Sequence, residues 1–243
     1  MIGVIYSLTK GVAARGRPEL PADAKAALWL TAILIAAAAY VVFVWFVLYP
    51  WAGSSHVLVL AIAIYLVPLV IYALPAYLRV RPHGAIGFYF GKQDWSLAVV
   101  LAAFAVIASF ARNATFGIID PVSAYVPLTL AAVPSFLVQS LNNGIPEETL
   151  FRGYLLPQLA AFLRRPWLAM LVMIVVFGLF HLPTEVAQSN VSPWLWALRD
   201  VFPLEPFALV VGYAYWRSRS LVPGIFLHTY ITLWASSMFF SFR

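Results

Sequence analysis

The sequence predicts an all-α fold, a polytopic membrane helix bundle of seven to eight helices with a buried polar cavity. Of the 243 residues 63% are hydrophobic and only 10% are charged, and the mean hydropathy is +0.90. Soluble domains carry about 25% charged residues, so this chain cannot present an ordinary wet surface. Its apolar residues stand in unbroken runs rather than in alternation, which argues against a transmembrane β-barrel.

The first three apolar runs have the length of a helix that crosses a bilayer, roughly 20 residues. Residues 27–49 form the first run, which we expect Pro50 to close because proline disrupts a helix interior. Residues 57–78 form the second run. Residues 95–111 form the third, with a charged residue at each side. Each of the three is predicted to be a transmembrane helix.

A fourth run, residues 125–141, contains two prolines and is predicted to be kinked. The stretch Asn-Asn-Gly-Ile-Pro at 142–146 is then expected to break the chain. Pro146 suits the first position of a new helix, which we predict over residues 147–163. A pair of glutamates therefore opens this predicted helix.

An apolar helix over residues 166–181 follows, and we expect Pro183 to end it. Residues 184–193 are predicted to form a polar loop. The short aromatic piece around Trp194 and Trp196 is typical of the membrane interface.

Two more helices, over residues 203–216 and 221–240, complete the predicted bundle. No repeat or low-complexity linker divides the chain, so residues 1–243 are interpreted as one transmembrane domain. Zero cysteines exclude disulfides, thiolate metal sites and a cysteine nucleophile. The basic segment 1–26 places the N-terminus of this multi-pass integral membrane protein in the cytoplasm.

The net charge of +6 comes from short basic clusters between the apolar runs. Such clusters are typical of anchors for anionic lipid, and they argue against nucleic acid as a partner. Keeping both the Arg164–Arg165 pair and the Arg217–Arg219 pair cytoplasmic requires that one segment near Glu147 does not cross. A re-entrant or interfacial helix is therefore expected there, buried against protein or lining a watery cavity.

Ionisable side chains inside apolar surroundings are costly and indicate a functional site. Glu147 and Glu148 fit the first turn of a helix, where the helix dipole favours negative charge without any catalytic role. Glu148 and Arg152 are four residues apart and share a helix face as an ion pair. Glu147 lies about 140° around the helix from Arg152, so it is free to act as a base.

Two histidines lie in other apolar helices. His181 shares a face with Phe177, and alone it would be interpreted as a satisfied core or interfacial residue. His228 and Thr232 are one turn apart in the last span, where a hydrogen bond between helices would explain them equally well. A Glu with two His residues, held away from bulk water, is nevertheless a plausible set for activating a water molecule.

The three motifs together resemble those of the CPBP family of intramembrane proteases, which includes the CaaX prenyl-protein endopeptidases and bacteriocin-related members. That family is marked by Glu-Glu-x-x-x-Arg, then Phe-x-x-x-His, then His-x-x-x-Asn. This chain has Glu147-Glu148…Arg152, Phe177…His181 and His228…Thr232 in the same order, within a core at 134–232. It departs from the pattern at Thr232, where the family usually has Asn.

The resemblance implies hydrolysis of peptide bonds in lipidated or membrane-embedded substrates, at a site without metal or other cofactor. Glu147, helped by His181, would activate water, and His228 with Thr232 would stabilise the oxyanion. Glu148 and Arg152 would hold the scaffold. The implied partners are the lipid bilayer and a peptide or protein substrate, either prenylated or transmembrane.

Three rival functions use the same residues. A catalytically silent relative, acting as a scaffold, chaperone or immunity protein for a membrane partner, is favoured by Thr232. A transporter or proton relay also needs intramembrane Glu and His, but no inverted repeat is visible. A zinc hydrolase would use Glu147, His181 and His228 as ligands, although the chain has no His-Glu-x-x-His motif.

Overall fold

The computed structural model describes residues 1–10, 20–52, 56–84, 87–116, 133–188 and 202–240. The regular structure of these residues is helical, and their only strand-like pairing is an isolated bridge between Gly87 and Ser220. The predicted all-α bundle is confirmed. Among the described residues, three stretches are long and apolar enough to cross a membrane, namely Ala24–Ala52, Leu58–His83 and Pro166–Thr184.

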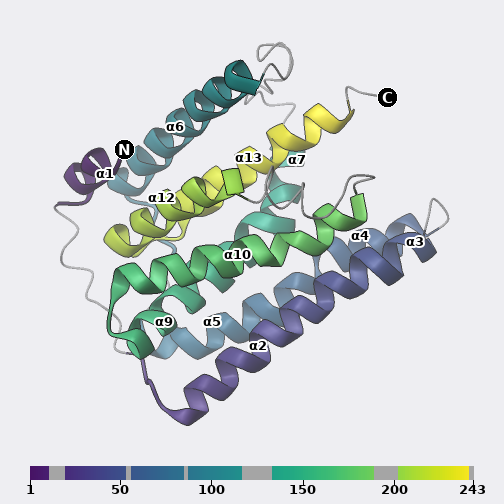
Figure 1. Ribbon diagram of the computed structural model, residues 1–243, viewed down its shortest axis with the longest axis horizontal. Helices are drawn as coiled ribbons and strands as arrows, with labels where there is room; N and C mark the ends of the chain where they lie inside the picture. The colour runs from purple at the N-terminus through teal and green to yellow at the C-terminus, as the bar shows by residue number, and fades with distance from the viewer. Residues whose placement is uncertain (11–19, 53–55, 85–86, 117–132, 189–201, 241–243) are drawn as a thin grey trace.

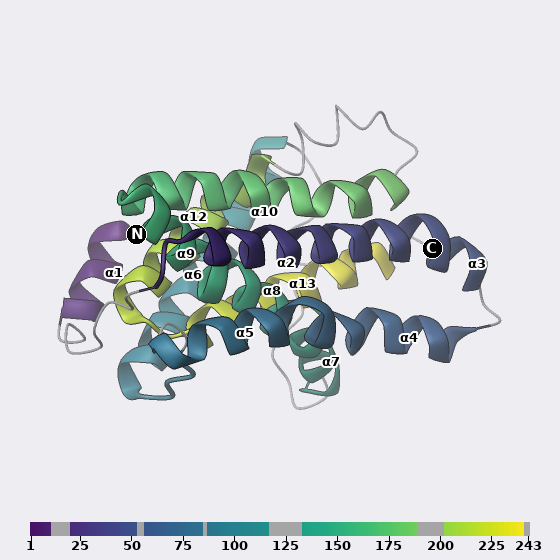
Figure 2. The ribbon, with the colours of Figure 1, turned by 90° about the horizontal axis from the view of Figure 1, so that it is seen from below.

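The longer helices lie roughly along one direction of the molecule, and the short helix α1 lies at one end (Figures 1 and 2). In chain order the elements are α1 (Ile2–Thr9), α2 (Ala24–Phe43), η2 (Val44–Leu48), α3 (Tyr49–Ala52), α4 (Val57–Tyr65), η3 (Leu69–Ala73), α5 (Leu74–Val80), η4 (Arg81–His83), α6 (Lys92–Phe116), α7 (Val133–Gln139), η6 (Ser140–Gly144), α8 (Ile145–Glu148), η7 (Thr149–Leu155), α9 (Leu156–Leu163), α10 (Pro166–Gln188), α12 (Phe202–Ser218) and α13 (Val222–Phe240).

Pro50 does not end the first span, contrary to the sequence-based expectation, because α3 carries the helix on to Ala52. The turn before it, η2, is a π turn in which the N–H of Tyr49 donates to the carbonyl of Val44. A proline ring clashes with the carbonyl four residues back in an α-helix. The wider π turn relieves that clash, so the helix passes through the proline.

A π turn also precedes three other prolines. The π turns η3, η6 and η7 each end two residues before a proline, at Pro75, Pro146 and Pro157 respectively. The predicted break at 142–146 is therefore wrong, since α7 to α9 form one helical path from Val133 to Leu163. Pro146 is in the first two positions of α8, and that short helix continues directly from η6.

Pro183 likewise lies inside α10, which continues to Gln188 rather than ending at His181. The two last predicted spans correspond to α12 and α13. Three predicted pieces lie outside the described residues: the start of the fourth run (125–132), the second half of the polar loop (189–193) and the aromatic piece at 194–196.

In the core, α13 packs closely against η6 and α8. The hydroxyls of Ser140 and Thr229 are 3.1 Å apart, and both residues are buried. Gly144 faces the same spot, where an added Cβ would lie 2.3 Å from the Thr229 hydroxyl. Small residues of this kind let membrane helices approach closely. This approach brings α13 next to the two glutamates of α8.

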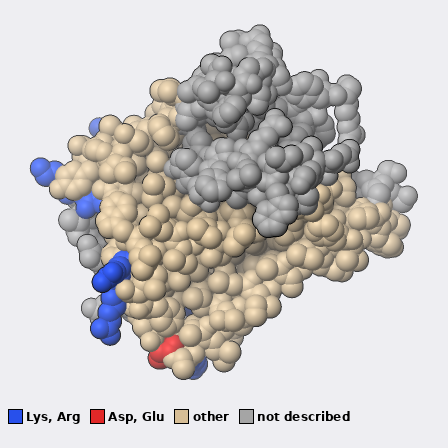
Figure 3. Space-filling model, in the orientation of Figure 1, with Lys and Arg blue, Asp and Glu red and all other residues tan. Residues whose placement is uncertain are grey.

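One end of the bundle, which we call the basic end, collects the loops and helix ends that carry most Lys and Arg residues. Ser220 there donates a hydrogen bond to the Tyr89 carbonyl at 3.2 Å, and Arg217 donates to Thr9 at 3.2 Å. On the face in Figure 3 the blue side chains lie along the left-hand edge. The basic residues of this end are Lys10, Lys25, Arg79, Arg81, Lys92, Arg164, Arg165, Arg217 and Arg219.

This arrangement removes the reason for a re-entrant helix near Glu147. That expectation arose from counting 125–141 and 147–163 as two separate segments. In the structure, residues 133–141 and 147–163 belong to one helical path, α7 to α9. That path ends beside Arg164, at the basic end.

Candidate functional site

The two glutamates of α8 are buried in the middle of the bundle. Glu147 is 6% exposed and Glu148 is 1% exposed. Arg152, one turn further on in η7, is 2% exposed and donates from Nη1 to Glu148 Oε1 at 2.9 Å. The predicted ion pair is confirmed. Because both partners are buried, removing either would leave an uncompensated charge in an apolar core.

Glu148 has a second partner that the sequence did not predict. Its Oε1 also lies 3.0 Å from Nδ1 of His228 in α13. The carboxylate therefore joins three elements, α8, η7 and α13, rather than serving Arg152 alone. Since the oxygen already accepts from Arg152, the imidazole nitrogen must donate to it, which places a hydrogen on Nδ1 of His228.

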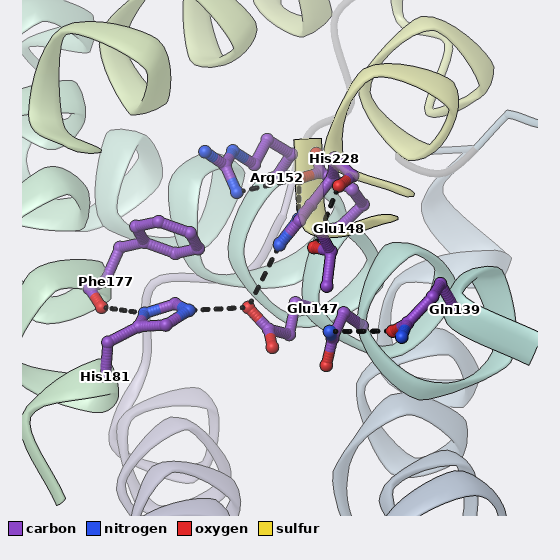
Figure 4. A network of polar contacts seen from close by, with 9 residues as sticks. Gln139, Glu147, Glu148, Arg152, Phe177, His181 and His228 are labelled. Carbon is purple, nitrogen blue, oxygen red and sulfur yellow. Dashed lines mark hydrogen bonds and ion pairs between the residues drawn. The ribbon is translucent and has the colours of Figure 1, made fainter. Parts of the chain in front are cut away.

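Glu147 faces both histidines, as Figure 4 shows. Its Oε2 is 3.4 Å from His181 Nε2 and 3.6 Å from His228 Nε2. His181 is oriented from its other side, where Nδ1 lies 2.9 Å from the Phe177 carbonyl. A carbonyl can only accept, so Nδ1 of His181 carries a hydrogen. Each imidazole is thus anchored through Nδ1 and directs Nε2 at Glu147.

Phe177 packs at the centre of this cluster. Its ring lies 4.5 Å from the Arg152 guanidinium carbon and 4.6 Å from the ring centre of His181. It also meets the ring of His228 edge-on at 6.0 Å. An aromatic face stabilises a desolvated cation, and here it also limits how both imidazoles can rotate. Phe177 therefore supports the polar groups from the apolar side.

Thr232 lies in the same cavity as the cluster. Its hydroxyl donates to the backbone carbonyl of His228 at 3.0 Å, a local bond within α13. A carboxamide at this position would carry two N–H donors, whereas the hydroxyl has one. The geometry thus brings Thr232 beside the histidine without aiming its hydrogen at Glu147.

The cluster lines a cavity of about 580 Å³, a volume in the range of ligand-binding sites. Sequence reasoning missed several polar residues in its wall, namely Tyr72, Gln139, Asn142 and Asn143. Asn143 donates to Gln139 at 3.5 Å, one turn back along the helix. Asn143 and Gln139 lie one and two turns before Glu147, so helical spacing could have placed them on the same side as Glu147. The predicted break at 142–146 prevented that inference.

Gly224 was also missed, although it stands four residues before His228 on the same helix. A Cβ at Gly224 would lie 2.5 Å from Glu148 Oε2 and 3.0 Å from Val211 Cγ1. The missing side chain makes the room that the Glu148 carboxylate occupies against α13.

The cluster could also hold a metal ion. One ligand atom each from Glu147, His181 and His228 lies within 4.8 Å of the others. Ligand atoms around tetrahedral zinc, with bonds of about 2.0–2.2 Å, stand about 3.3–3.6 Å apart. The distances from Glu147 Oε2 to the two histidine Nε2 atoms, 3.4 and 3.6 Å, are compatible with that arrangement. The fit makes zinc a testable alternative to a metal-free site.

Fold and site together define a helical membrane protein with a buried Glu–His–His cluster facing a cavity. Residues 129–234 match the family model described as Rce1-like, type II CAAX prenyl endopeptidase. The match agrees with the resemblance that the three motifs indicated. The match includes all the residues of the cluster. No curated protein and no solved structure matches the chain.

Proposed function

We propose that the protein is an intramembrane endopeptidase that uses Glu147 as its catalytic base. The observation that carries this proposal is the convergence of Glu147 Oε2 with the Nε2 atoms of two anchored histidines. The family match supports protease chemistry, since Rce1-like proteins are described as prenyl endopeptidases. The substrate is a peptide or protein segment within the bilayer, either prenylated or transmembrane.

The water to be activated lies against Glu147 and His181. With Nδ1 of His181 donating to Phe177, the neutral imidazole has a lone pair on Nε2. Glu147 and His181 then each accept one hydrogen from a water, which leaves an oxygen lone pair for the scissile carbonyl carbon. As the C–O bond forms, the water's proton passes to Glu147, and later to the amine that leaves when the C–N bond breaks.

The oxyanion of the tetrahedral intermediate is stabilised by His228. When protonated on both nitrogens, this histidine donates from Nδ1 to Glu148 and from Nε2 to the oxyanion. The charges of His228 and Arg152 then balance those of Glu147 and Glu148. Glu148 therefore orients His228 through Nδ1 as well as binding Arg152. Thr232 adds a second donor once its hydroxyl leaves the His228 carbonyl.

The placement in the membrane is part of the proposal. We infer a multi-pass protein with the N-terminus in the cytoplasm, because the basic end contains α1 and most Lys and Arg residues. Basic residues near span ends set orientation by the positive-inside rule.

The test compares wild type with Glu147→Gln and its neighbour Glu148→Gln on prenylated, unprenylated and transmembrane peptides. Glu147→Gln keeps the shape but removes the base, so turnover should fall by about 10²–10⁴-fold with the thermal midpoint unchanged. Glu148→Gln should lower the midpoint as well, because it weakens contacts to both Arg152 and His228. Turnover at the wild-type rate by Glu147→Gln would show that Glu147 is not the catalytic base.

Each reaction is run with and without a chelator. Turnover that is indifferent to chelator supports the glutamate mechanism. Turnover abolished by chelator and restored by zinc assigns the cluster to a zinc hydrolase instead. Substrate binding without turnover in the wild type, with turnover appearing in Thr232→Asn, assigns the protein as a silent scaffold.

A further inference from the structure

Tyr72 is a buried tyrosine whose hydroxyl has no part in the mechanism proposed above. Its side chain is 2% exposed and lines the same cavity as Glu147. Within the described part of the chain, the Tyr72 hydroxyl makes no hydrogen bond. A buried tyrosine usually finds a partner for its O–H group. An unpaired hydroxyl in a cavity wall is therefore available to whatever molecule enters the cavity.

The neighbouring Tyr40 shows the ordinary arrangement. Its hydroxyl, on α2, donates to the backbone carbonyl of Ala63 in α4. The rings of Tyr40 and Tyr72 lie 6.2 Å apart and tilted. Of these two adjacent hydroxyls, one is used by the fold and the other is not. A structural hydrogen bond therefore explains Tyr40 but does not explain Tyr72.

Neighbouring aromatic rings determine where the Tyr72 hydroxyl lies. Besides Tyr40, the ring of Phe180 meets the Tyr72 ring edge-on at 6.0 Å. Phe180 precedes His181 in α10, and its ring centre is 5.8 Å from that of the imidazole. A tyrosine side chain has only two χ angles, so packing of the ring also fixes the position of the hydroxyl oxygen. Tyr72 is a preorganised donor at the edge of the Glu–His–His cluster.

The backbone brings Tyr72 next to α8. Tyr72 belongs to η3, the π turn before Pro75, and η3 packs against α8. The phenol and the Glu147 carboxylate are close enough to interact electrostatically. Glu147 directs Oε2 at both imidazoles, and Figure 4 shows its other oxygen turned away from them. The negative charge of the carboxylate attracts the hydrogen of the Tyr72 hydroxyl.

We propose that Tyr72 is a further catalytic residue, whose hydroxyl donates a hydrogen bond to the substrate carbonyl oxygen as this oxygen becomes the oxyanion. The inference rests on the proposed protease function. The oxyanion forms on the carbon that is attacked by the water bound to Glu147, so it develops close to a donor beside that carboxylate. When the water's proton passes to Glu147, negative charge leaves the carboxylate and appears on the oxyanion. The Tyr72 hydroxyl rotates its hydrogen to the new charge.

Thr232 is less ready to act as this donor. Its hydroxyl donates to the His228 carbonyl, and that bond must break before the hydroxyl reaches an oxyanion. The Tyr72 hydroxyl gives up no bond within the described residues. A phenol is also more acidic than an aliphatic alcohol, which makes it the stronger donor to an anion. His228 from α13 and Tyr72 from η3 are then the two donors to the oxyanion.

Tyr72→Phe tests this role, because it removes the hydroxyl and keeps the ring. Its matched control is Tyr154→Phe in η7, where the side chain is 1% exposed and the hydroxyl is also unpaired among the described residues. Tyr154 is not one of the described residues that line the cavity. Each full-length variant and the wild type are compared for kcat, KM and thermal midpoint on one membrane peptide in detergent.

We expect Tyr72→Phe to lower kcat by about 10²-fold, the effect of losing one oxyanion donor. Its KM and thermal midpoint should stay at the wild-type values, because the hydroxyl acts only when charge develops. Tyr154→Phe should match the wild type in kcat and KM. A peptide phosphinate, a charged mimic of the tetrahedral intermediate, gives a readout besides turnover. Its inhibition constant should rise in Tyr72→Phe by the same factor as kcat falls.

Wild-type kcat in Tyr72→Phe would overturn the proposal. A rise in KM alone would also overturn it, since the hydroxyl would then bind only the ground state. So would an equal loss of kcat and of thermal midpoint in Tyr72→Phe and Tyr154→Phe, which would make both hydroxyls structural.

Glu147→Gln, measured in parallel, separates this proposal from the proposed function. Turnover that is lost in Glu147→Gln and retained in Tyr72→Phe refutes the role of Tyr72 alone. Turnover retained in Glu147→Gln refutes the glutamate mechanism, and the assignment of Tyr72 fails with it. An absence of turnover in the wild type on every peptide refutes both.

Discussion

Gly224→Ala should disturb the site through Glu148 without touching a catalytic group directly. The added Cβ would lie 2.5 Å from Glu148 Oε2, whereas ordinary van der Waals contact begins at 3.4 Å. The carboxylate must therefore retreat by about 0.9 Å, the difference between those two distances. Its other oxygen holds Arg152 at 2.9 Å and His228 at 3.0 Å, so a shift of that size lengthens both bonds beyond useful geometry.

The expected loss of folding stability follows from the weakening of those two contacts. Hydrogen bonds to charged groups contribute about 1.5–3 kcal/mol each, and small overpacking costs about 1–3 kcal/mol. Because the carboxylate can rotate to keep one partner, we expect a destabilisation of about 2–3 kcal/mol. Hydrolysis should fall further, by about 100-fold, since a displacement near 1 Å in a positioning group has that effect on rate.

The assay pairs thermal unfolding in detergent with peptide hydrolysis, and Gly212→Ala is the matched control. A Cβ at Gly212 would meet the Met173 Cε methyl at 3.0 Å, the end of a flexible side chain that can move aside. Both substitutions gain the same helix propensity. If the two variants are equally stable and equally active, the close approach of α13 to Glu148 has no part in the site.

Two further substitutions examine the other supports of the cluster. Thr232→Asn should maintain or raise the hydrolysis rate, because a carboxamide can donate one N–H to the His228 carbonyl and still have a second N–H for the oxyanion. A clear loss in the steady-state rate would exclude position 232 from the oxyanion site. Phe177→Leu removes the ring whose centre lies 4.5 Å from the Arg152 guanidinium carbon and 4.6 Å from the centre of the tilted His181 ring. We expect this substitution to lower the free energy of unfolding by about 1–2 kcal/mol and to lower turnover, as measured by denaturation and by hydrolysis. Unchanged turnover would mean that Phe177 only fills space.

The helical class and the last two spans followed from apolar run length, because each buried or lipid-facing helix needs a continuous apolar stretch. Helix ends were less predictable. Proline was interpreted as a stop at Pro50, at 142–146 and at Pro183, and the helix continues through all three. The rule that proline ends a helix assumes α geometry, and at Pro50 and Pro146 a π turn before the proline removes that assumption. At Pro183 no π turn precedes the proline, and α10 continues as an α-helix.

The site was predictable to the extent that it depends on spacing within a helix. Glu148 and Arg152 pair because they are four residues apart. The bond between Glu148 and His228 could not be read from spacing, since it joins residues 80 apart in the sequence. It depends on how closely α13 approaches α8, and that distance is determined by the missing side chain at Gly224.

The four π turns have more in common than a following proline, since each contributes to the cavity wall: Val44 and Trp45 from η2, Tyr72 from η3, Asn142 and Asn143 from η6, and Arg152 from η7. A π turn widens the helix and shifts the direction of the side chains that follow. Two such turns flank the four residues of α8 and so isolate both glutamates on a short α segment. At Pro50, Pro75, Pro146 and Pro157, proline therefore does not divide the chain into separate helices. These four prolines each follow a wide turn that lines the polar cavity, so their positions in the sequence mark part of its wall.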